Sequence, residues 1–455
     1  MPEPDERIAP APPEVTPPPP EAGDGLPAGW RAIMPDLRPL RRHRDYRLLT
    51  IGQSVSFLGS MVTYVAVPYQ VFSLTHSSLA VGLIGVVQMA AILSLAFLGG
   101  ALADAADRRR LVRLAESGQL VCSAGLLVNA SLGRPLTWPV FVLAGAIAGL
   151  GAIQRPALSG LVPRLVDRDE LTAAGAIDAL VRTVGMIGGP AFAGLLLAGP
   201  GLRFAYGIDA ATFAVSLGAL TLMRAVPPPP EAERPSLRRV VEGLRYARSR
   251  PELIGTYLID MAAMFFGMPM ALFPALAVRY GGSAALGALY AAPSVGAFLA
   301  TVTSGWTGRV HRHGRAISVA AVLWGVAIIA FGLAPWLWLA LAGLALAGAA
   351  DMISGIFRMT MWNETIPDHL RGRLASIELL SYTSGPLLGN AEAGAAAAVL
   401  GVRASVVSGG AMCVVAVGLT AAALPAFWAY DARRDQKEES GISPSNRGDG
   451  DALLS

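Results

Sequence analysis

The amino-acid sequence predicts an all-α membrane protein with twelve transmembrane helices arranged as two pseudo-symmetric six-helix bundles. Three observations lead to this fold class. Only 15% of the 455 residues are charged, against about 25% in a typical soluble chain. Twelve apolar segments follow one another along the chain, each near the ~20 residues that a membrane-spanning helix needs. The connections between them are alternately rich and poor in arginine, as expected for a chain that crosses a membrane repeatedly.

The twelve apolar segments are predicted to be helices, because uninterrupted runs of this length cross a bilayer as helices and not as barrel strands. Pro335 separates the ninth segment from the tenth. The predicted spans are residues 48–73, 79–103, 111–131, 137–158, 171–198, 203–224, 252–278, 284–308, 316–334, 336–358, 373–399 and 403–428.

The chain outside the spans contains three longer polar segments. Residues 1–37 are rich in proline and acidic residues, and they are expected to be disordered, as is the tail 431–455. The central segment 225–251 starts with four prolines and continues with apolar residues at helical spacing. Both an amphipathic helix on the inner membrane face and a solvated linker helix fit this pattern. The predicted six-helix halves are therefore residues 38–224 and 252–430.

The distribution of arginine predicts that both termini are cytoplasmic. With the N-terminus inside, each outer loop that contains a basic residue contains a single arginine, whereas the inner segments contain clusters. Cytoplasmic loops of membrane proteins carry the excess of positive charge. An asymmetry that holds over every loop also supports the count of twelve spans. The outer arginines are Arg134, Arg203, Arg279 and Arg403.

Several classes of function are excluded by residue usage. Lys437 is the only lysine and follows Gln436, so the Gly-Lys pair of a phosphate-binding P-loop is absent. The arginines form no continuous basic stripe, so nucleic acid is not expected as a partner. Cys122 and Cys413 lie far apart in apolar runs and form no zinc pattern. No catalytic or metal-ligand constellation stands in any loop, and we expect neither an enzyme nor a cofactor.

Pairs of short motifs indicate that the two halves are internal repeats. The segment GGALADAADRRRL at residues 99–111 follows the second span, and TSGWTGRVHRHGRA takes the corresponding place after the eighth. The fifth span contains GGP ending at Pro190, and the eleventh contains SGP ending at Pro386. Parallel six-helix repeats are typical of one large transporter architecture.

The loop motif resembles that of the major facilitator superfamily, G-x-x-x-D-[RK]-x-G-[RK]-[RK]. Ala105 stands where the pattern has a basic residue and Asp107 where it has its second glycine; the matching residues are Gly100, Asp104, Arg108 and Arg109. In the superfamily this aspartate contacts an arginine near the inner end of helix four and the start of helix eleven, and so locks the outward-open state. The resemblance implies a cytoplasmic gate in which Arg155 is the helix-four candidate. A role in membrane topology alone is the alternative.

Further segments narrow the resemblance to the branch with the enterobactin-exporting and macrolide-efflux proteins. They are the proline run of the central segment, FGMPMALFPALA (266–277), GALYAAPSVGA (287–297) and TSGWTGRVHRHG (303–314). The resemblance covers most of residues 40–428. It implies a multi-pass transporter in the cytoplasmic membrane of a bacterium.

The fifth span contains a G-x-x-x-G-P core formed by Gly185, Gly189 and Pro190. This core resembles the antiporter motif of the superfamily, which favours export over import. Small residues also let membrane helices approach closely, so helix packing explains the core equally well.

Ionisable side chains within the predicted spans are candidates for function, because a charge in the membrane is costly. Asp260 lies about two turns inside the seventh span, and it is the first candidate for carrying a coupling proton. The alternative is a structural carboxylate paired with a neighbouring helix. Glu392 in the eleventh span is the second candidate. Asp351 and Arg358 in the tenth span are expected to form an ion pair, as are Asp178 and Arg182 in the fifth.

A substrate cavity is expected between the halves near the membrane midplane. Gln53 and Tyr64 place polar and aromatic groups on one side of the first span, which suits either a cavity wall or helix packing. The full set of cavity candidates is Gln53, Tyr64, Met264, Phe265, Tyr290 and Asn390.

The function predicted from these features is secondary active export of a hydrophobic or amphiphilic small molecule, a siderophore or a drug, by proton antiport with alternating access. The expected partners are this small molecule, protons and the lipid bilayer, and the expected state is a monomer. An uncoupled or importing carrier is the alternative. A sensor or scaffold is disfavoured, because the chain offers no sizeable soluble domain.

Overall fold

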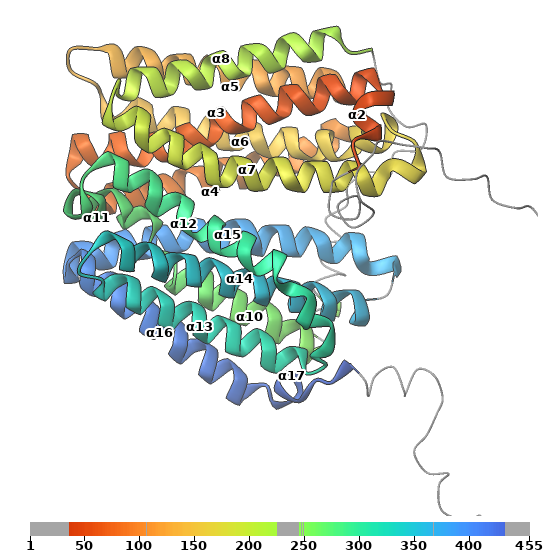
Figure 1. The fold of residues 1–455 in the computed structure, drawn as a ribbon, viewed down its shortest axis with the longest axis vertical. Helices are drawn as coiled ribbons and strands as arrows, with labels where there is room; N and C mark the ends of the chain where they lie inside the picture. Colours follow the sequence, from red (N-terminus) through yellow and green to blue (C-terminus); the bar gives the residue numbers. More distant parts are fainter. Residues whose placement is uncertain are drawn as a thin grey trace, which may run out of the picture. The chain divides into compact units, whose positions relative to one another are not determined.

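The computed structural model describes residues 36–105, 107–224, 245–246, 248, 250–366 and 368–432, without the side chains of 96–105 and 368–382. In this part of the chain the regular structure is entirely helical (Figure 1). Those helices belong to one unit that begins at Leu37.

The N-terminal half is a bundle of six long helices preceded by the short helix α2, Arg38–Arg42. Its main packing pairs are α3 with α8, α4 with α6, α5 with α6 and α8, and α3 with α7. The six helices are α3 (Arg44–Thr75), α4 (Ser78–Ala105), α5 (Arg108–Ser131), α6 (Thr137–Leu161), α7 (Leu171–Ala198) and α8 (Leu202–Leu222).

The C-terminal half repeats this arrangement with one helix broken. Its main packing pairs are α12 with α14, α13 with α14 and α16, and α10 with α15 and α16. Its helices are α10 (Pro251–Phe266), α11 (Phe273–Tyr280), α12 (Ser283–Val302), α13 (His313–Leu333), α14 (Leu337–Thr365), α15 (Asp368–Leu400), α16 (Val402–Ala423) and α17 (Pro425–Ala429).

The predicted fold class is confirmed. By length and composition, eleven helical segments in the described part of the chain could cross a membrane, and each coincides with a predicted span. The remaining predicted span, 373–399, lies within α15, Asp368–Leu400. The predicted terminal segments 1–37 and 431–455, and most of the central segment 225–251, lie outside the described residues. The division into these domains therefore stays a prediction.

The seventh span, predicted as one helix over 252–278, is broken in the structure. Helix α10 ends at Phe266, a 3-10 turn η3 follows at Met270–Leu272, and α11 begins at Phe273. Pro269 lacks a backbone N–H and so cannot continue a helical hydrogen-bond ladder. Pro274 stands in the first turn of α11, where a missing N–H costs nothing. The break places η3 against α4 and α15.

Other boundaries differ from the predicted spans by a few residues. The eighth span, predicted to reach 308, ends as an α-helix at Val302 and continues as the 3-10 segment Ser304–Arg309. The twelfth, predicted to reach 428, ends at Ala423, and Pro425 starts the separate helix α17.

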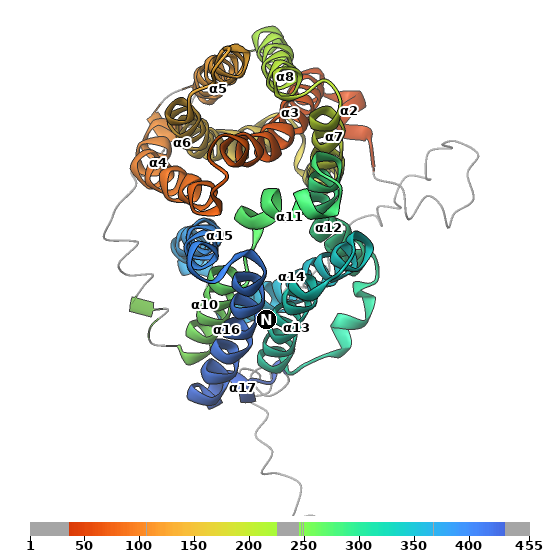
Figure 2. The same cartoon turned by 90° about the vertical axis from the view of Figure 1, so that its left-hand side faces the viewer.

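The two halves meet along α4 with α15 and along α7 with α12 (Figure 2). Glycines let the backbones approach each other closely. A Cβ added at Gly194 of α7 would lie 2.8 Å from the Cα of Gly287 of α12. A Cβ added at Gly394 of α15 would lie 2.6 Å from the Ser78 oxygen at the start of α4.

These close contacts lie near the helix ends that the arginine pattern places outside. Gly194 is near the end of α7 at Ala198, and Gly287 is near the start of α12 at Ser283. Gly82 and Gly85 of α4 make the equivalent approach to α15 at Asn390 and Leu387. The halves are therefore closed toward the predicted outer side.

Replacing Gly287 with valine is expected to separate α7 from α12 and to open the outer side, because the new side chain meets the backbone of Gly194 and Pro190. The measurement is the rate at which an impermeant thiol reagent, added outside, labels a cysteine placed at Phe265, a half-buried cavity candidate. The native Cys122 and Cys413 are buried.

The matched control is Gly207→Val in α8, since a Cβ there meets nothing within 4 Å. We expect faster labelling in the Gly287 variant and unchanged labelling in the Gly207 variant. Equal rates in the two variants would contradict the assignment of this contact as the outer closure.

Candidate functional site

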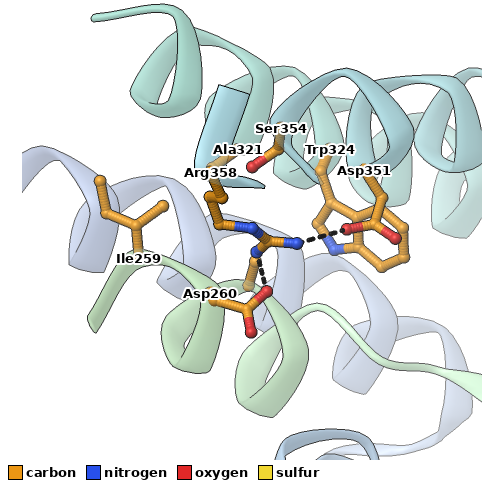
Figure 3. Close-up of a pocket in the computed structure, with 8 residues that line it drawn as sticks. Ile259, Asp260, Ala321, Trp324, Asp351, Ser354 and Arg358 are labelled. Atoms are coloured by element: carbon orange, nitrogen blue, oxygen red, sulfur yellow. Dashed lines mark hydrogen bonds and ion pairs between the residues drawn. The ribbon is translucent and has the colours of Figure 1, made fainter. Parts of the chain in front are cut away.

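Asp260 forms part of a buried charge cluster within the C-terminal half (Figure 3). Arg358 of α14 donates from Nη1 to Oδ1 of Asp260 on α10. The Nη2 of Arg358 lies 3.6 Å from Oδ1 of Asp351, two turns earlier on α14. The side chains of Asp260 and Arg358 are 12% and 11% exposed. The expected pair Asp351–Arg358 is thus extended by Asp260, the proton candidate, into a group of three.

The space beside this cluster is too small for an organic substrate. Its cavity volume is about 10 Å³, and it is lined by Trp324 and Ser354 together with the charged groups. That volume is roughly what a single water molecule needs. Asp260 therefore lies inside the C-terminal bundle, paired with a neighbouring helix, and a role in proton transfer stays a prediction.

Three of the predicted cavity residues meet between the halves, near the broken seventh span. The hydroxyl of Tyr64 on α3 donates to the Met270 sulfur at 2.9 Å, and its ring packs edge-on against Tyr290 of α12 at 5.4 Å. Tyr290 donates to the backbone oxygen of Met270 at 3.1 Å. The side-chain oxygen of Asn390 on α15 accepts from the N–H of Ala271 at 2.9 Å. We call Tyr64, Met270 and Tyr290 the outer plug.

The other cavity candidates lie apart from the outer plug. Met264 is buried on α10, where its backbone oxygen faces Gly389 of α15. Phe265 packs edge-on against Phe266 at 5.0 Å. Gln53 points into the N-terminal bundle and donates to Glu116.

Glu392 is half-buried on α15, two residues after Asn390. The structure thus brings Tyr64, Tyr290 and Asn390 together and leaves the remaining candidates separate.

The predicted cytoplasmic gate is described only in part. The side chains of Gly100 and Asp104 lie outside the description, so the contact of Asp104 with Arg155 stays a prediction. Arg108 donates to the Gly160 oxygen of α6 at 2.6 Å. Arg109 donates to the oxygens of Leu220 and Thr221 at the end of α8, both at 2.7 Å. These two arginines bind carbonyls at helix C-termini, where positive charge is favoured.

Asp107, which replaces a glycine of the superfamily pattern, caps α5. Its carboxylate accepts from the backbone N–H of Arg109 at 2.9 Å. An acidic N-cap satisfies a helix donor that has no partner within the helix. The departure from the motif therefore has a local structural reason.

The glycines of the fifth-span motif pack within the N-terminal half. A Cβ at Gly185 would meet the ring of Phe57, and one at Gly189 would meet Met61, both on α3. Only Pro190 reaches the other half, through the approach of its backbone oxygen to Gly287. The expected Asp178–Arg182 pair forms at 2.8 Å.

Two acids that are buried within predicted spans were not among the candidates chosen from the sequence. Glu116 of α5 and Asp209 of α8 are 0% and 1% exposed. Both stand in predicted spans, 111–131 and 203–224, so the rule that selected Asp260 would also have found them.

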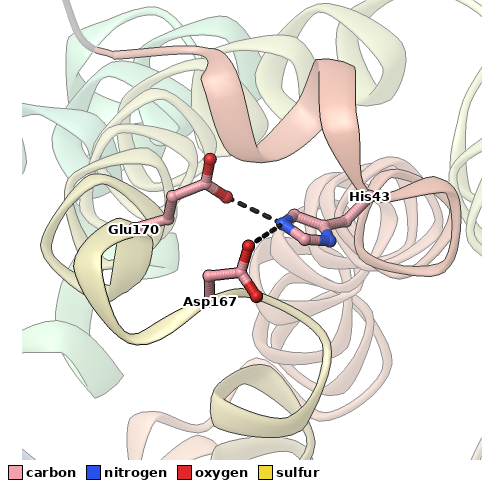
Figure 4. Close-up of side chains that lie close together, drawn as sticks. All are labelled: His43, Asp167 and Glu170. Carbon is pink, nitrogen blue, oxygen red and sulfur yellow. Dashed lines mark hydrogen bonds and ion pairs between the residues drawn. The ribbon is translucent and has the colours of Figure 1, made fainter. Parts of the chain in front are cut away.

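A third cluster joins the start of α3 to the connection between α6 and α7 (Figure 4). His43 Nε2 lies 2.8 Å from Glu170 Oε2 and 3.8 Å from Asp167 Oδ2. The three ligand atoms lie within 4.8 Å of one another, and these residue types bind Zn²⁺ in other proteins. Arg42 stands 3.5 Å from the second oxygen of Glu170. Because this guanidinium competes with a cation, the cluster is an ion-pair link between two inner segments.

Comparison with known proteins identifies the family of the chain. The family described as transmembrane secretion effector matches residues 35–442. The chain belongs to this family. The resemblance to major facilitator transporters is thereby confirmed, and the protein is a multi-pass membrane transporter of small molecules.

Proteins similar in sequence include enterobactin exporters. The enterobactin exporter EntS of Citrobacter koseri is 32% identical over 369 residues, which make up 80% of this chain and 88% of that protein. The EntS protein of Escherichia coli O1:K1 is 31% identical over the same shares.

Solved structures show the same fold at lower sequence identity. A bacterial homologue of the lysosomal transporter Spinster, in an inward-facing conformation, has a TM-score of 0.66 and 17% identity and covers 88% of this chain and 98% of its own. An inward-facing bacterial homologue of ferroportin has a TM-score of 0.62 and 17% identity over 85% and 98%.

Replacing Arg358 with leucine is expected to lower the free energy of unfolding by about 3–5 kcal/mol, because the buried carboxylate of Asp260 loses its cation. The measurement is the apparent Tm of the purified protein in detergent. The matched control is Arg182→Leu, whose pair with Asp178 is 61% exposed on both sides and contributes about 0–1 kcal/mol. A similar small shift in both variants would contradict the structural role of Arg358.

Proposed function

We propose that this transmembrane secretion effector exports a hydrophobic or amphiphilic small molecule from the cytoplasm by alternating access, driven by proton antiport. The observation that carries the proposal is the closure of the two halves toward the predicted outer side. Among the described residues, the glycines at which the two halves approach each other lie toward the predicted outer side. The outer plug lies toward the same side. A carrier closed at that end receives its substrate from the cytoplasm.

The outer plug supports export with a removable barrier. Its contacts are two hydrogen bonds and edge-on aromatic packing, which cost little to separate. Tyr64 belongs to the N-terminal half, while Met270 and Tyr290 belong to the C-terminal half. A rocking motion of the halves would therefore break the contacts of Tyr64 and leave the Tyr290–Met270 bond intact.

A siderophore is the substrate class that we favour. Relatives at 31–32% identity are enterobactin exporters. Two aromatic side chains can pack against rings of an amphiphilic ligand. They are those of Tyr64, a residue that is 44% exposed, and of the half-buried Phe265. A hydrophobic drug such as a macrolide has the same general character and is the second candidate. The alternative of an uncoupled carrier differs in having no dependence on protons.

Deleting the gene from an iron-starved strain is expected to retain siderophore inside the cells, because its path of release is lost. The measurement is the distribution of siderophore between cells and medium, with the wild-type gene returned as the control. Unchanged secretion would contradict the siderophore assignment, and drug-susceptibility panels would then test the second candidate.

Removing the ring of Tyr64 is expected to reduce net export, because the outer side no longer closes and substrate leaks back. Tyr64→Phe is the matched control, since it keeps the aromatic contact with Tyr290 and removes the hydroxyl that bonds to Met270. We expect Tyr64→Ala to lose net export and Tyr64→Phe to keep most of it. Full export by Tyr64→Ala would show that the plug is not the barrier.

A further inference from the structure

The interior of the N-terminal bundle contains two layers of polar side chains, all buried except the half-buried Gln53. The middle layer consists of Thr63, Ser123 and Asp209, and the inner layer consists of Gln53, Glu116 and Gln154. We call these six residues the interior polar column. Ser123 follows Glu116 by seven residues on α5, which places the two layers two turns apart on one helix face.

In the middle layer, Asp209 accepts two hydrogen bonds on one oxygen. Thr63 of α3 donates to Oδ2 at 2.7 Å, and Ser123 of α5 donates to the same atom at 2.6 Å. The other oxygen, Oδ1, is buried without a hydrogen-bond partner. The carboxyl group is thus held from two helices and still has one unused oxygen.

In the inner layer, Glu116 has the same arrangement. Gln53 of α3 donates to Oε1 at 2.5 Å, and Gln154 of α6 donates to it at 3.0 Å. The second oxygen, Oε2, is buried without a hydrogen-bond partner. Each acid therefore has neutral donors on one oxygen and none on the other.

The hydrogen-bond partners of Asp209 are neutral. Tyr206, one turn earlier on α8, gives its hydroxyl to Gln70. Arg203, at the start of the same helix, donates to backbone oxygens of Ala130 and Ser131. Within the described chain, Asp209 forms no ion pair.

The hydrogen-bond partners of Glu116 are also neutral. The hydroxyl oxygen of Ser216 on α8 accepts a hydrogen bond from the same Gln53 amide nitrogen at 3.2 Å. Arg113, one turn earlier on α5, and Arg155, beside Gln154 on α6, form no ion pair with Glu116 among the residues that the structure describes. The Asp178–Arg182 pair of α7 is closed on itself at the surface.

The two halves therefore neutralise their buried acids differently. In the C-terminal half, Arg358 supplies a positive charge to Asp260 and Asp351. In the N-terminal half, only a bound proton can remove the negative charge of Asp209 and of Glu116. An unpaired carboxylate buried without water is very costly, and such a group takes a proton instead.

We infer that Asp209 and Glu116 bind the coupling protons of this transporter, while Asp260 is a fixed partner of Arg358. The inference rests on the proton antiport of the proposed function. Each acid gains one proton when its carboxylate becomes a carboxylic acid and returns one proton on release. The proton sites are then in the half opposite to the one that sequence reasoning selected.

Neighbouring residues on α3 connect these sites to the outer plug. Thr63 donates to Asp209, and the next residue, Tyr64, contacts Met270 and Tyr290 of the other half. Gly59, one turn earlier, lets α3 approach α8 so closely that a Cβ there would lie 3.0 Å from Asp209 Oδ1. Helix α3 therefore contacts both Asp209 within its own half and the outer plug between the halves.

The first test needs no substrate. Infrared difference spectra of the purified full chain, taken from mildly acid to mildly alkaline buffer, record the carbonyl stretch of protonated carboxyl groups. We expect Asp209→Asn to remove one such band and Glu116→Gln to remove another, whereas Asp260→Asn removes none. Loss of a band in Asp260→Asn alone would overturn the inference.

The second test uses enterobactin as the probe in proteoliposomes. We expect the variants Asp209→Asn and Glu116→Gln to lose transport driven by a pH gradient and to keep counterflow exchange, which needs no net proton movement. Gradient-driven transport that survives in both variants would overturn the inference. If the wild type shows no gradient-driven transport of the probe, the proposed function fails, and the infrared bands still decide where protons bind.

A further variant guards against misfolding of the acid replacements. Thr63→Val removes one donor to Asp209 and keeps the carboxyl group. We expect its Asp209 band to persist and to change in frequency, because the carboxyl group loses a hydrogen-bond donor. A band that keeps its wild-type frequency would contradict the assignment to Asp209.

Discussion

The arrangement of the two halves depends on the close approach of helix backbones at glycine. Lipid offers no hydrophobic gain when two apolar helices meet, so association inside a membrane relies on tight packing of small residues. Gly194 and Gly287 let α7 and α12 touch, and Gly82 and Gly394 do the same for α4 and α15. Because these contacts lie at one end, they fix which side is closed and bring Tyr64 of one half against Met270 and Tyr290 of the other.

Buried charge is distributed unequally over this framework. The C-terminal half places Arg358 between the carboxylates of Asp260 and Asp351. The N-terminal half surrounds Glu116 and Asp209 with hydroxyl and amide donors only. The first arrangement is a fixed structural element, whereas the second responds to protons. The internal repeat of the fold thus supports two different uses of the same residue type.

The sequence predicted the fold well, because lipid forces long apolar runs into helices and the arginine pattern orders them. The break after Phe266 depended on the positions of Pro269 and Pro274, which a hydropathy criterion does not weigh. The site was predicted less completely. The partner of Asp260 stands 98 residues away, a distance at which local spacing carries no information. The sequence identified three cavity candidates that do meet, Tyr64, Tyr290 and Asn390. The place where these side chains meet depends on the broken helix.

Thr63 and Tyr64 point about 100° apart on one rigid helix, as consecutive helical residues do. One faces an acid that holds a proton, and the other faces the barrier to the outside. Thermodynamic linkage makes any coupling between two such sites reciprocal. Consider a molecule that binds beside Tyr64 and prefers one position of α3. If its binding changes the proton affinity of Asp209 by some factor, protonation of Asp209 changes the affinity for that molecule by the same factor. An inhibitor of this transporter would then have a potency that depends on pH, even if the inhibitor itself never titrates.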